Sequence, residues 1–271
     1  MSFTEKLAGA ERRHDSLVCV GLDPDPARFP EPWRGDTRRL FDFCAAIVDA
    51  THDRVLAFKP QIAYFAAHRA EEQLERLIAH IARVAPDVPV ILDAKRGDIG
   101  ATAEQYAREA FERYRADALT LSPFMGFDSI EPYLRHADKG LFLLCRTSNR
   151  GGDDLQSLPL ADGGLLYERI AALAQDAWNR TGQLGLVVGA TYPAEIERVR
   201  ALAPTVPLLI PGVGAQGGDA VATVRAGWRA DAPIVVNSSR AICYASGGED
   251  FAEAARREAL RTRDALQAAR P

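Results

Sequence analysis

The sequence predicts a (β/α)8 barrel of the α/β class, the TIM-barrel architecture, folded as a single domain over residues 1–271. Eight short runs of apolar residues alternate along the chain with amphipathic stretches, as in repeated βα units. The runs are apolar at almost every position, which is typical of parallel strands covered on both faces, and eight such units indicate closure into a barrel. A doubly wound open sheet remains the alternative, because alternation by itself does not prove closure.

Each expected strand is a short run of apolar, often β-branched residues, the composition that favours strands. In chain order the strands are LVCVGLD (17–23), VLAFK (55–59), VPVILDAK (88–95), ALTLSP (118–123), GLFLLCRTS (140–148), LGLVVGA (184–190), VPLLIPGVG (206–214) and PIVVNSS (233–239). The expected helices are amphipathic and rich in Ala, Glu and Arg. They cover residues 62–84, 101–115, 164–181, 194–203, 217–229 and 249–268.

Two connections are too long for ordinary turns. The first is the proline-rich stretch DPDPARFPEPWRGD (23–36), and the second is the glycine-rich stretch SNRGGDDLQSLPLADGG (148–164). Both follow the carboxyl end of an expected strand, where barrels of this kind collect their binding and catalytic residues. We therefore expect these loops to contribute to a site.

The composition gives no reason to expect a nucleic-acid or membrane partner, because 33 basic residues against 37 acidic ones leave a net charge of only −4. No apolar stretch approaches the ~20 residues that span a bilayer, and residues 1–16 lack the apolar core of a signal peptide. A cytoplasmic protein is expected.

No metal site is expected, because the five histidines form no pair at ligand spacing. The four cysteines are far apart, and most lie in or beside apolar runs, which favours buried free thiols over disulfides. They are Cys19, Cys44, Cys145 and Cys243.

A dense group of charges ends the third expected strand, where residues 93–102 read DAKRGDIGAT. Alternation along a strand places Asp93 and Lys95 on one face, and Asp98 and Thr102 share a face if a helix starts there. Flanking carboxylates favour the protonated form of a lysine. This pattern indicates that Lys95 acts as a general acid.

Other polar residues end neighbouring strands and should meet at the same rim of the barrel. A lysine directly after a buried strand, as at Lys59 in AFKP, needs a partner, and Asp93 on the next strand could supply it. A structural ion pair is the alternative interpretation. The polar groups of the rim are Asp23, Lys59, Asp93, Lys95, Ser122, Ser148, residues 211–216 and Arg240.

The stretch PGVGAQGGD (211–219) has the composition of an anion-binding turn. Glycines let the backbone approach a ligand closely, and amides at a helix start attract anions. Loops after the seventh and eighth strands commonly bind phosphate in such barrels, and Arg240 offers a fork of donors after the eighth. Together they favour a phosphate site over a plain surface turn.

With these motifs the chain resembles the orotidine 5′-phosphate decarboxylase family. DAKRGDIGATA matches that family's Asp-x-Lys-x-x-Asp-Ile-x-x-Thr signature, and PGVGAQGGD matches its phosphate loop. VGLDPDP with Asp23 and AFKP with Lys59 also fit. The long insertion after Asp23 and the TSN context of Ser148 resemble the longer bacterial subgroup, known as type 2.

The resemblance implies a role for each matching residue. Catalysis and ribose binding would use Asp23, Lys59, Asp93, Lys95 and Thr102, with Asp98, Ile99 and Thr102 reaching into the site of a partner subunit. Ser148 would bind the pyrimidine ring. Phosphate would be held by Gln216 and Arg240, beside Pro211 of the loop and Ser239, which stands where the family usually has glycine.

The implied reaction converts orotidine 5′-monophosphate to uridine 5′-monophosphate and carbon dioxide in a homodimer, without metal or cofactor. Lys95 would stabilise the C6 carbanion and protonate it, whereas Asp93 would either destabilise the substrate carboxylate or orient the lysines. Two other functions remain open. One is a metal-dependent sister enzyme, a 3-keto-gulonate-phosphate decarboxylase or hexulose-phosphate synthase, and the other is a barrel that binds a nucleotide without turnover.

Overall fold

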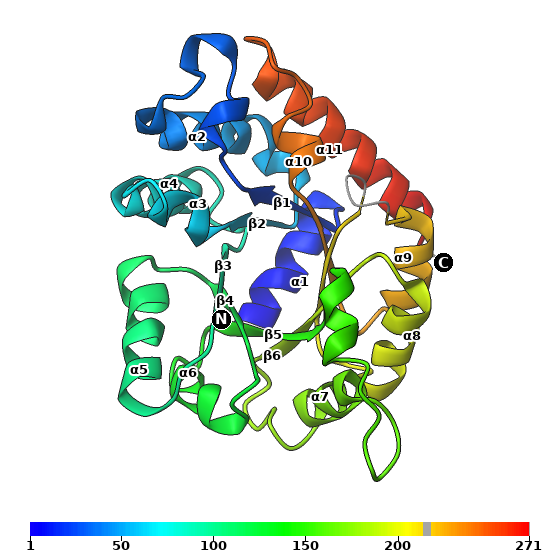
Figure 1. Ribbon diagram of the computed structural model, residues 1–271. Coiled ribbons are helices and arrows are strands. Elements are labelled where there is room, and N and C mark those ends of the chain that lie inside the picture. The colour runs from blue at the N-terminus through cyan, green and yellow to red at the C-terminus, as the bar shows by residue number, and fades with distance from the viewer. Residues whose placement is uncertain (214–217, 271) are drawn as a thin grey trace.

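The computed structural model describes residues 1–213 and 218–270 and contains one eight-stranded sheet (Figure 1). Its strands are β1 (Val18–Leu22), β2 (Ala57–Pro60), β3 (Ile91–Arg96), β4 (Ala118–Leu121), β5 (Gly140–Arg146), β6 (Leu184–Val188), β7 (Leu208–Pro211) and β8 (Ile234–Ser238). Each lies within or overlaps a strand predicted from the sequence.

The sheet closes into a barrel. Its strands follow the order β2-β1-β8-β7-β6-β5-β4-β3, and the neighbouring strands pair in parallel. Two parallel bridges, Phe58 with Val90 and Gln61 with Asp93, join the β2 and β3 segments at the ends of that order. The (β/α)8 prediction is confirmed, and the open-sheet alternative is wrong.

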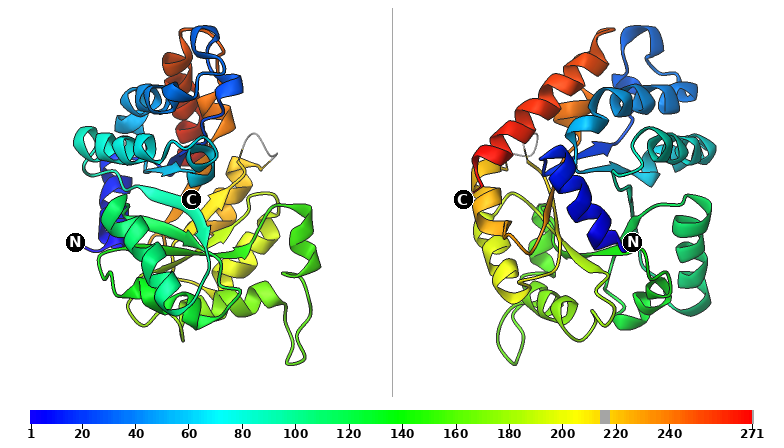
Figure 2. Two further views of the ribbon diagram at one scale, coloured as in Figure 1. Left: turned by 60° about the vertical axis from the view of Figure 1, so that its left-hand side comes forward. Right: turned by 180° about the vertical axis from the view of Figure 1, so that it is seen from behind.

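Helices surround the barrel (Figures 1 and 2). They are α1 (Phe3–His14), α2 (Leu40–Thr51), α3 (Ile62–Ala66), α4 (Glu71–Val84), α5 (Gly100–Arg108), α6 (Glu131–Leu134), α7 (Leu166–Gln175), α8 (Pro193–Leu202), α9 (Ala220–Gly227), α10 (Arg240–Cys243) and α11 (Phe251–Ala268). The helix predicted over 62–84 is two helices, because the chain turns between them with Arg69 in the left-handed region at φ 53°. A π-helical turn, Glu109–Arg113, continues α5.

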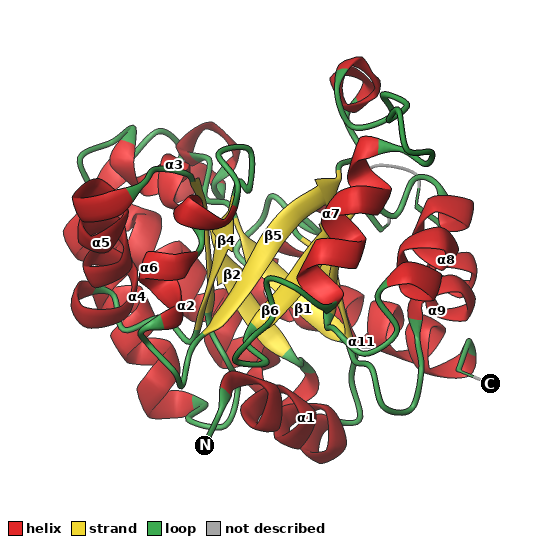
Figure 3. Cartoon of the chain, turned by 90° about the horizontal axis from the view of Figure 1, so that it is seen from below, coloured by secondary structure: helices red, strands yellow, loops and turns green. Residues whose placement is uncertain are grey.

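The barrel interior begins with an apolar layer that receives one side chain from each strand. These residues are Cys19, Ala57, Ile91, Ala118, Phe142, Val187, Leu209 and Val235, and all are buried. Helix α1 covers this layer where the strands start (Figure 3). Phe3 of α1 packs edge-on against Phe142 at 5.7 Å, over Gly140, where any Cβ would overlap the Phe3 ring. The end of the barrel where the strands begin is therefore closed, and a ligand must approach from the end where the strands finish.

The long connection 23–36 is packed against the barrel rather than extended into solvent. It forms short 3-10 turns, and its Phe29 stacks on Phe43 of α2 with ring centroids 4.5 Å apart. Phe43 also stacks on Tyr244 and on Phe251 of α11. This aromatic group holds the middle of the connection, at Phe29, against α2 and α11.

The four cysteines are buried and free, as predicted. Within residues 1–213 and 218–270, none of the helices combines the length and the apolar character needed to cross a membrane.

Candidate active site

A cavity of about 490 Å³ opens at the carboxyl ends of the strands, within the usual size range of small-molecule sites. Its floor lies two residues beyond the apolar layer, which is one full strand period, so the side chains point into the barrel again. Floor residues from five strands are Lys59, Asp93, Thr120, Leu144 and Asn237. The walls include Asp23, Lys95, Ser148, Pro211, Ser239 and Arg240. The polar groups predicted at the rim therefore do converge among the described residues, apart from Ser122, which does not line this cavity; residues 214–216 of the predicted rim lie outside the described residues.

One buried carboxylate joins two lysines at the floor. Asp93 Oδ2 accepts a hydrogen bond from Lys59 Nζ at 2.7 Å, and Asp93 Oδ1 accepts one from Lys95 Nζ at 2.6 Å. Lys59 and Asp93 are buried, whereas the Lys95 side chain remains 47% exposed toward the cavity. One lysine is thus buried against Asp93 at the cavity floor, and the other directs its ammonium into the cavity.

Charge pairing outweighs burial at this pair. Burial opposes the Lys59 charge, but the carboxylates of Asp93 and Asp23 overcome it and raise the pKa of Lys59 above its ordinary value. Burial likewise favours neutral Asp93, yet Lys59 and Lys95 hold the pKa of Asp93 well below its usual range. Both partners of the buried pair therefore stay ionised at neutral pH.

The backbone around Lys95 is unusual and is held by Thr120. Lys95 adopts a left-handed φ of 48°, and the pairing of β3 with β4 shifts register between Leu92 and Arg96. The Thr120 hydroxyl accepts hydrogen bonds from the N–H groups of Ala94 and Lys95, both at 3.0 Å, and donates to Asp93 at 2.9 Å. A bulge of this kind re-aims a side chain beside a site. Thr120 was not predicted as a site residue, although it is a polar residue within the apolar run ALTLSP.

Asp98, Ile99 and Thr102 follow β3 in the chain, but they are not among the described residues that line this cavity. Helix α5 begins at Gly100, two residues after Asp98, so the condition under which Asp98 and Thr102 would share a helix face is not met. The Asp98 carboxylate instead accepts a hydrogen bond from the N–H of Ile99 at 2.9 Å. Lys95 pairs with Asp93 and not with Asp98 in the described chain. Ile99 and Thr102 are exposed, Ile99 by 48%.

Another part of the cavity wall comes from the ends of β1 and β8. Asp23 Oδ1 is buried without a hydrogen-bond partner, while the Asp23 carbonyl accepts from the Tyr244 hydroxyl at 2.7 Å. On β8, Asn237 donates to the Ser239 hydroxyl at 3.2 Å, and Arg240 opens α10 at the exposed edge of the cavity. Gly21 makes room for this pair, since a Cβ there would lie 1.8 Å from Ser239 Oγ. Asn237 was not among the predicted site residues.

The predicted phosphate loop is described only in part. Pro211 lies at the end of β7 and lines the cavity together with Gly212 and Val213. Gln216 lies outside the described residues. In the part of the chain that the structure describes, no group of three or more His, Cys, Asp or Glu side chains could hold a metal ion.

The buried pair predicts a large loss of stability on Asp93→Asn. Breaking a buried ion pair by removing one partner costs roughly 3–5 kcal/mol, because the other charge is left unpaired. The pKa of Asp93 is lower in the folded chain than the ordinary ~3.9, so its contribution is present above about pH 4 and lost as the pH falls below it. We expect urea denaturation to show the full deficit at pH 7 and a smaller one at pH 3.5. The exposed pair of Asp36 with Arg38 offers the control, Asp36→Asn, which should change little. Equal stability of Asp93→Asn and the parent at pH 7 would contradict this reading.

Comparison with known proteins bears on this site directly. Residues 16–257 match the model of the orotidine 5′-phosphate decarboxylase / HUMPS family. The chain is 76% identical to the orotidine 5′-phosphate decarboxylase of Polaromonas naphthalenivorans (strain CJ2), covering 100% of this chain and 97% of that one. It is 73% identical to the enzyme of the same name from Leptothrix cholodnii, covering 99% and 98% of the two chains.

Solved structures agree with the sequence relatives. The structure of Leishmania donovani OMP decarboxylase superposes with a TM-score of 0.84 at 40% identity, covering 98% of this chain and 99% of that one. Leishmania donovani UMP synthase gives a TM-score of 0.86 at 40% identity, with 98% of this chain matched to 57% of the longer protein. The chain belongs to the orotidine 5′-phosphate decarboxylase / HUMPS family.

Proposed function

We propose that Lys95 is the general acid that protonates C6 in the reaction of this chain. The chain is a carboxy-lyase that converts orotidine 5′-phosphate to uridine 5′-phosphate and carbon dioxide. The observation that carries the proposal is the placement of the Asp93 carboxylate. One of its oxygens accepts a hydrogen bond from the buried Lys59, and the other accepts one from Lys95, which faces the cavity. When the bond from C6 to the carboxylate breaks, its electron pair stays on C6 and carbon dioxide leaves. A fixed ammonium beside C6 stabilises that charge and then transfers a proton to it.

The geometry favours an orienting role for Asp93. Both of its oxygens are already bonded, Oδ2 to Lys59 and Oδ1 to Lys95 and Thr120. Since the buried Lys59 cannot move without losing its partner, the carboxylate is held in place and in turn holds Lys95. An ammonium fixed before the reaction needs no reorganisation as negative charge develops.

The remaining cavity residues divide among the three parts of the substrate. Asp23 and Lys59 lie at the ends of β1 and β2, where they would hold the ribose hydroxyls; the buried, unpaired Oδ1 of Asp23 is a ready acceptor. Ser148, after β5, would bind the pyrimidine. Pro211 at the end of β7, and Ser239 and Arg240 directly after β8, would surround the phosphate together with Gln216 of the loop.

Arg240→Ala is expected to lower kcat/KM for orotidine 5′-phosphate by about 10- to 100-fold, the value of a hydrogen bond from a charged donor. Its exposed guanidinium lies at the cavity edge, at the start of α10, away from Lys95. Turnover of orotidine, which lacks the phosphate, should not change. Equal losses with both substrates would show that Arg240 does not bind phosphate.

We also propose a homodimer in which Asp98, Ile99 and Thr102 reach the partner's site. Apolar side chains are exposed on the segments that follow β2, β3 and β4, three neighbours in the barrel. They are Tyr64, Ile99, Phe124 and Met125, of which Phe124 is 76% exposed. An apolar surface on adjacent loops is typical of a subunit interface, and this one surrounds the segment that carries Asp98.

A single barrel domain acting in the cytoplasm completes the proposal. The eight strands share one sheet and one cavity, so no second unit is needed to complete the site. The substrate is a charged nucleotide, which does not cross membranes unaided, so an enzyme that uses it is best placed where it is made.

The experiment that tests this function is incubation of the purified protein with orotidine 5′-phosphate. We expect the absorbance of the substrate to fall while uridine 5′-phosphate and carbon dioxide appear in equal amounts. Tight binding of the substrate with no product formed would favour a nucleotide-binding barrel instead.

A further inference from the structure

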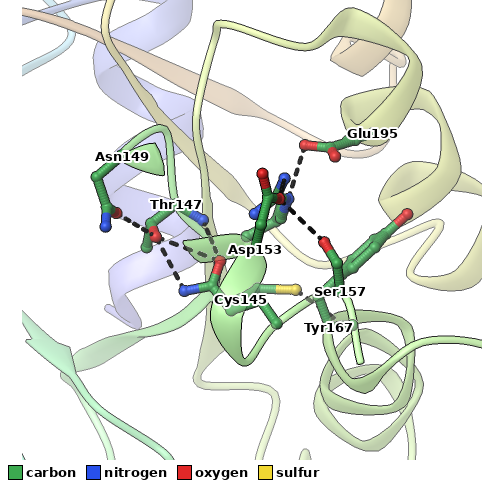
Figure 4. A network of polar contacts seen from close by, with 9 residues as sticks. Cys145, Thr147, Asn149, Asp153, Ser157, Tyr167 and Glu195 are labelled. Carbon is green, nitrogen blue, oxygen red and sulfur yellow. Dashed lines mark hydrogen bonds and ion pairs between the residues drawn. The ribbon is translucent and has the colours of Figure 1, made fainter. Parts of the chain in front are cut away.

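The long segment after β5 is tied to α8 by Arg146, through ion pairs with Asp153 of the segment and Glu195 of α8, two residues that Figure 4 labels. The Arg146 side chain is buried; its Nε donates to Glu195 of α8 at 2.9 Å, and its Nη2 donates to Asp153 of the segment at 2.6 Å. Asp153 also accepts a hydrogen bond from the Ser157 hydroxyl at 3.2 Å. The predicted loop 148–164 therefore has a charged anchor within it.

Within this segment, Gln156 holds Thr147 by two hydrogen bonds. The Thr147 N–H donates to Gln156 Oε1 at 2.8 Å, and Gln156 Nε2 donates to the Thr147 hydroxyl at 2.9 Å. The hydroxyl can then donate its own proton to Asn149 Oδ1, 2.6 Å away. The Thr147 hydroxyl also lies 3.2 Å from Gln156 Oε1, so the amide of Gln156 holds both the backbone and the side chain of Thr147.

Gln156 is itself held by the backbone on both sides. Its N–H donates to the carbonyl of Gly152 at 2.8 Å, and its carbonyl accepts from the N–H of Tyr167 in α7 at 2.9 Å. The space is tight, because a Cβ on Gly152 would lie 2.8 Å from Arg146 Nη1 and 3.0 Å from Gln156 Oε1. The backbone hydrogen bonds of Gln156 thus hold its side chain in place for the contact with Thr147.

These residues form one wall of the catalytic cavity, which Thr147, Ser148, Asn149 and Gln156 all line. Ser148 is the residue proposed above to bind the pyrimidine, and it lies between the two residues that the network fixes. Its placement depends on the conformation of residues 147–149.

We infer that Gln156 is a positioning residue for base recognition, which holds the turn 147–149 so that Ser148 meets the pyrimidine ring. The inference rests on the proposed function and extends it to a residue that acts through Thr147. It predicts that loss of Gln156 weakens binding of the base and leaves binding of the sugar phosphate intact.

The test compares two ligands, uridine 5′-phosphate and ribose 5-phosphate, which lacks a base. Because a fixed hydrogen bond is lost, Gln156→Ala should weaken the binding of uridine 5′-phosphate by about tenfold. The KM for orotidine 5′-phosphate should rise by a similar factor, and kcat should change less. Inhibition by ribose 5-phosphate should stay within about twofold of the parent, because its contacts lie on other strands.

A matched control exists at the opposite end of the barrel. Gln175 donates to the Thr205 hydroxyl at 2.8 Å and accepts from the Thr205 N–H at 3.1 Å, the same two-point contact away from the cavity. Gln175→Ala should leave the binding of uridine 5′-phosphate and of ribose 5-phosphate unchanged. Thr147→Val loses the hydroxyl but keeps the N–H that donates to Gln156, so it should weaken uridine 5′-phosphate binding in the same direction but by less. Thr147→Ser keeps the hydroxyl and should bind like the parent. This pair also tests the inference if Gln156→Ala does not fold by circular dichroism.

The outcomes separate the inference from the proposed function. If the parent protein and Gln156→Ala bind uridine 5′-phosphate equally well, the inference alone is overturned. If Gln156→Ala weakens the binding of both ligands equally, the inference is also overturned, because that result indicates a general structural role. A parent protein that neither binds uridine 5′-phosphate nor acts on orotidine 5′-phosphate contradicts the proposed function and the inference with it.

Discussion

Lys95→Ala is expected to lower kcat for orotidine 5′-phosphate by at least about 10³-fold, since it removes both the proton donor and the fixed charge beside C6. Lys95 lines the cavity with a half-exposed side chain, so truncation opens no cavity in the core. Asp93 keeps its hydrogen bonds from Lys59 and Thr120. The variant should therefore fold, as checked by circular dichroism and thermal denaturation.

A suitable control for this loss is Lys6→Ala. Lys6 also pairs with an aspartate, Asp117 at 2.8 Å, but it lies in α1 at the sealed end of the barrel. Its removal should leave kcat within about twofold, because it is far from the reacting atoms. If Lys95→Ala kept activity within tenfold of the parent, Lys95 would not be the general acid.

Mixing two inactive variants is expected to restore activity. Asp98→Ala and Lys95→Ala should each be inactive in a shared-site dimer, the first because Asp98 serves the partner's site and the second because Lys95 serves its own. In a mixed dimer, the site on the Asp98→Ala chain has its own Lys95 and receives an intact Asp98 from the partner. With random pairing about half the dimers are mixed and each has one complete site, so refolding the two together should recover roughly a quarter of the parent activity.

Native mass spectrometry supplies the control for this experiment. It should detect mixed dimers in the refolded sample, and each variant refolded alone should stay inactive. Mixed dimers without activity above that of the separate variants would contradict the shared site, and a monomer in solution would contradict the dimer itself.

The barrel could be predicted from sequence because its signal repeats. Eight apolar runs separated by amphipathic stretches indicate the same unit many times, so errors at single boundaries do not matter. Helices without such a signal were missed. Helix α2 is apolar on most of its surface, and α1 has few apolar residues, although the capping box of Ser2 with Glu5 marks its start.

The site was predictable only where residues lie close in sequence or end neighbouring strands. Asp93 and Lys95 belong to one motif, and Lys59 ends the adjacent strand, so their meeting follows from the barrel. The left-handed backbone of Lys95 depends on Thr120, 25 residues away, which no local pattern indicates. Likewise, the contact of Gln156 with Thr147 depends on how an irregular loop folds back, and loops lack the periodicity on which such predictions rest.

Turnover after exhaustive chelation, with two substrates side by side, tests the central claim most directly. A divalent metal at the floor would need free carboxylate oxygens, but both oxygens of Asp93 are occupied by ammonium groups. We therefore predict that the chelator-treated protein decarboxylates orotidine 5′-phosphate at the same rate as the untreated protein. It should not act on 3-keto-gulonate 6-phosphate, with or without added Mg²⁺. Activity that disappears on chelation and returns with Mg²⁺, or that acts on the sugar phosphate instead, would contradict the lysine-based mechanism and indicate the metal-dependent branch of the family.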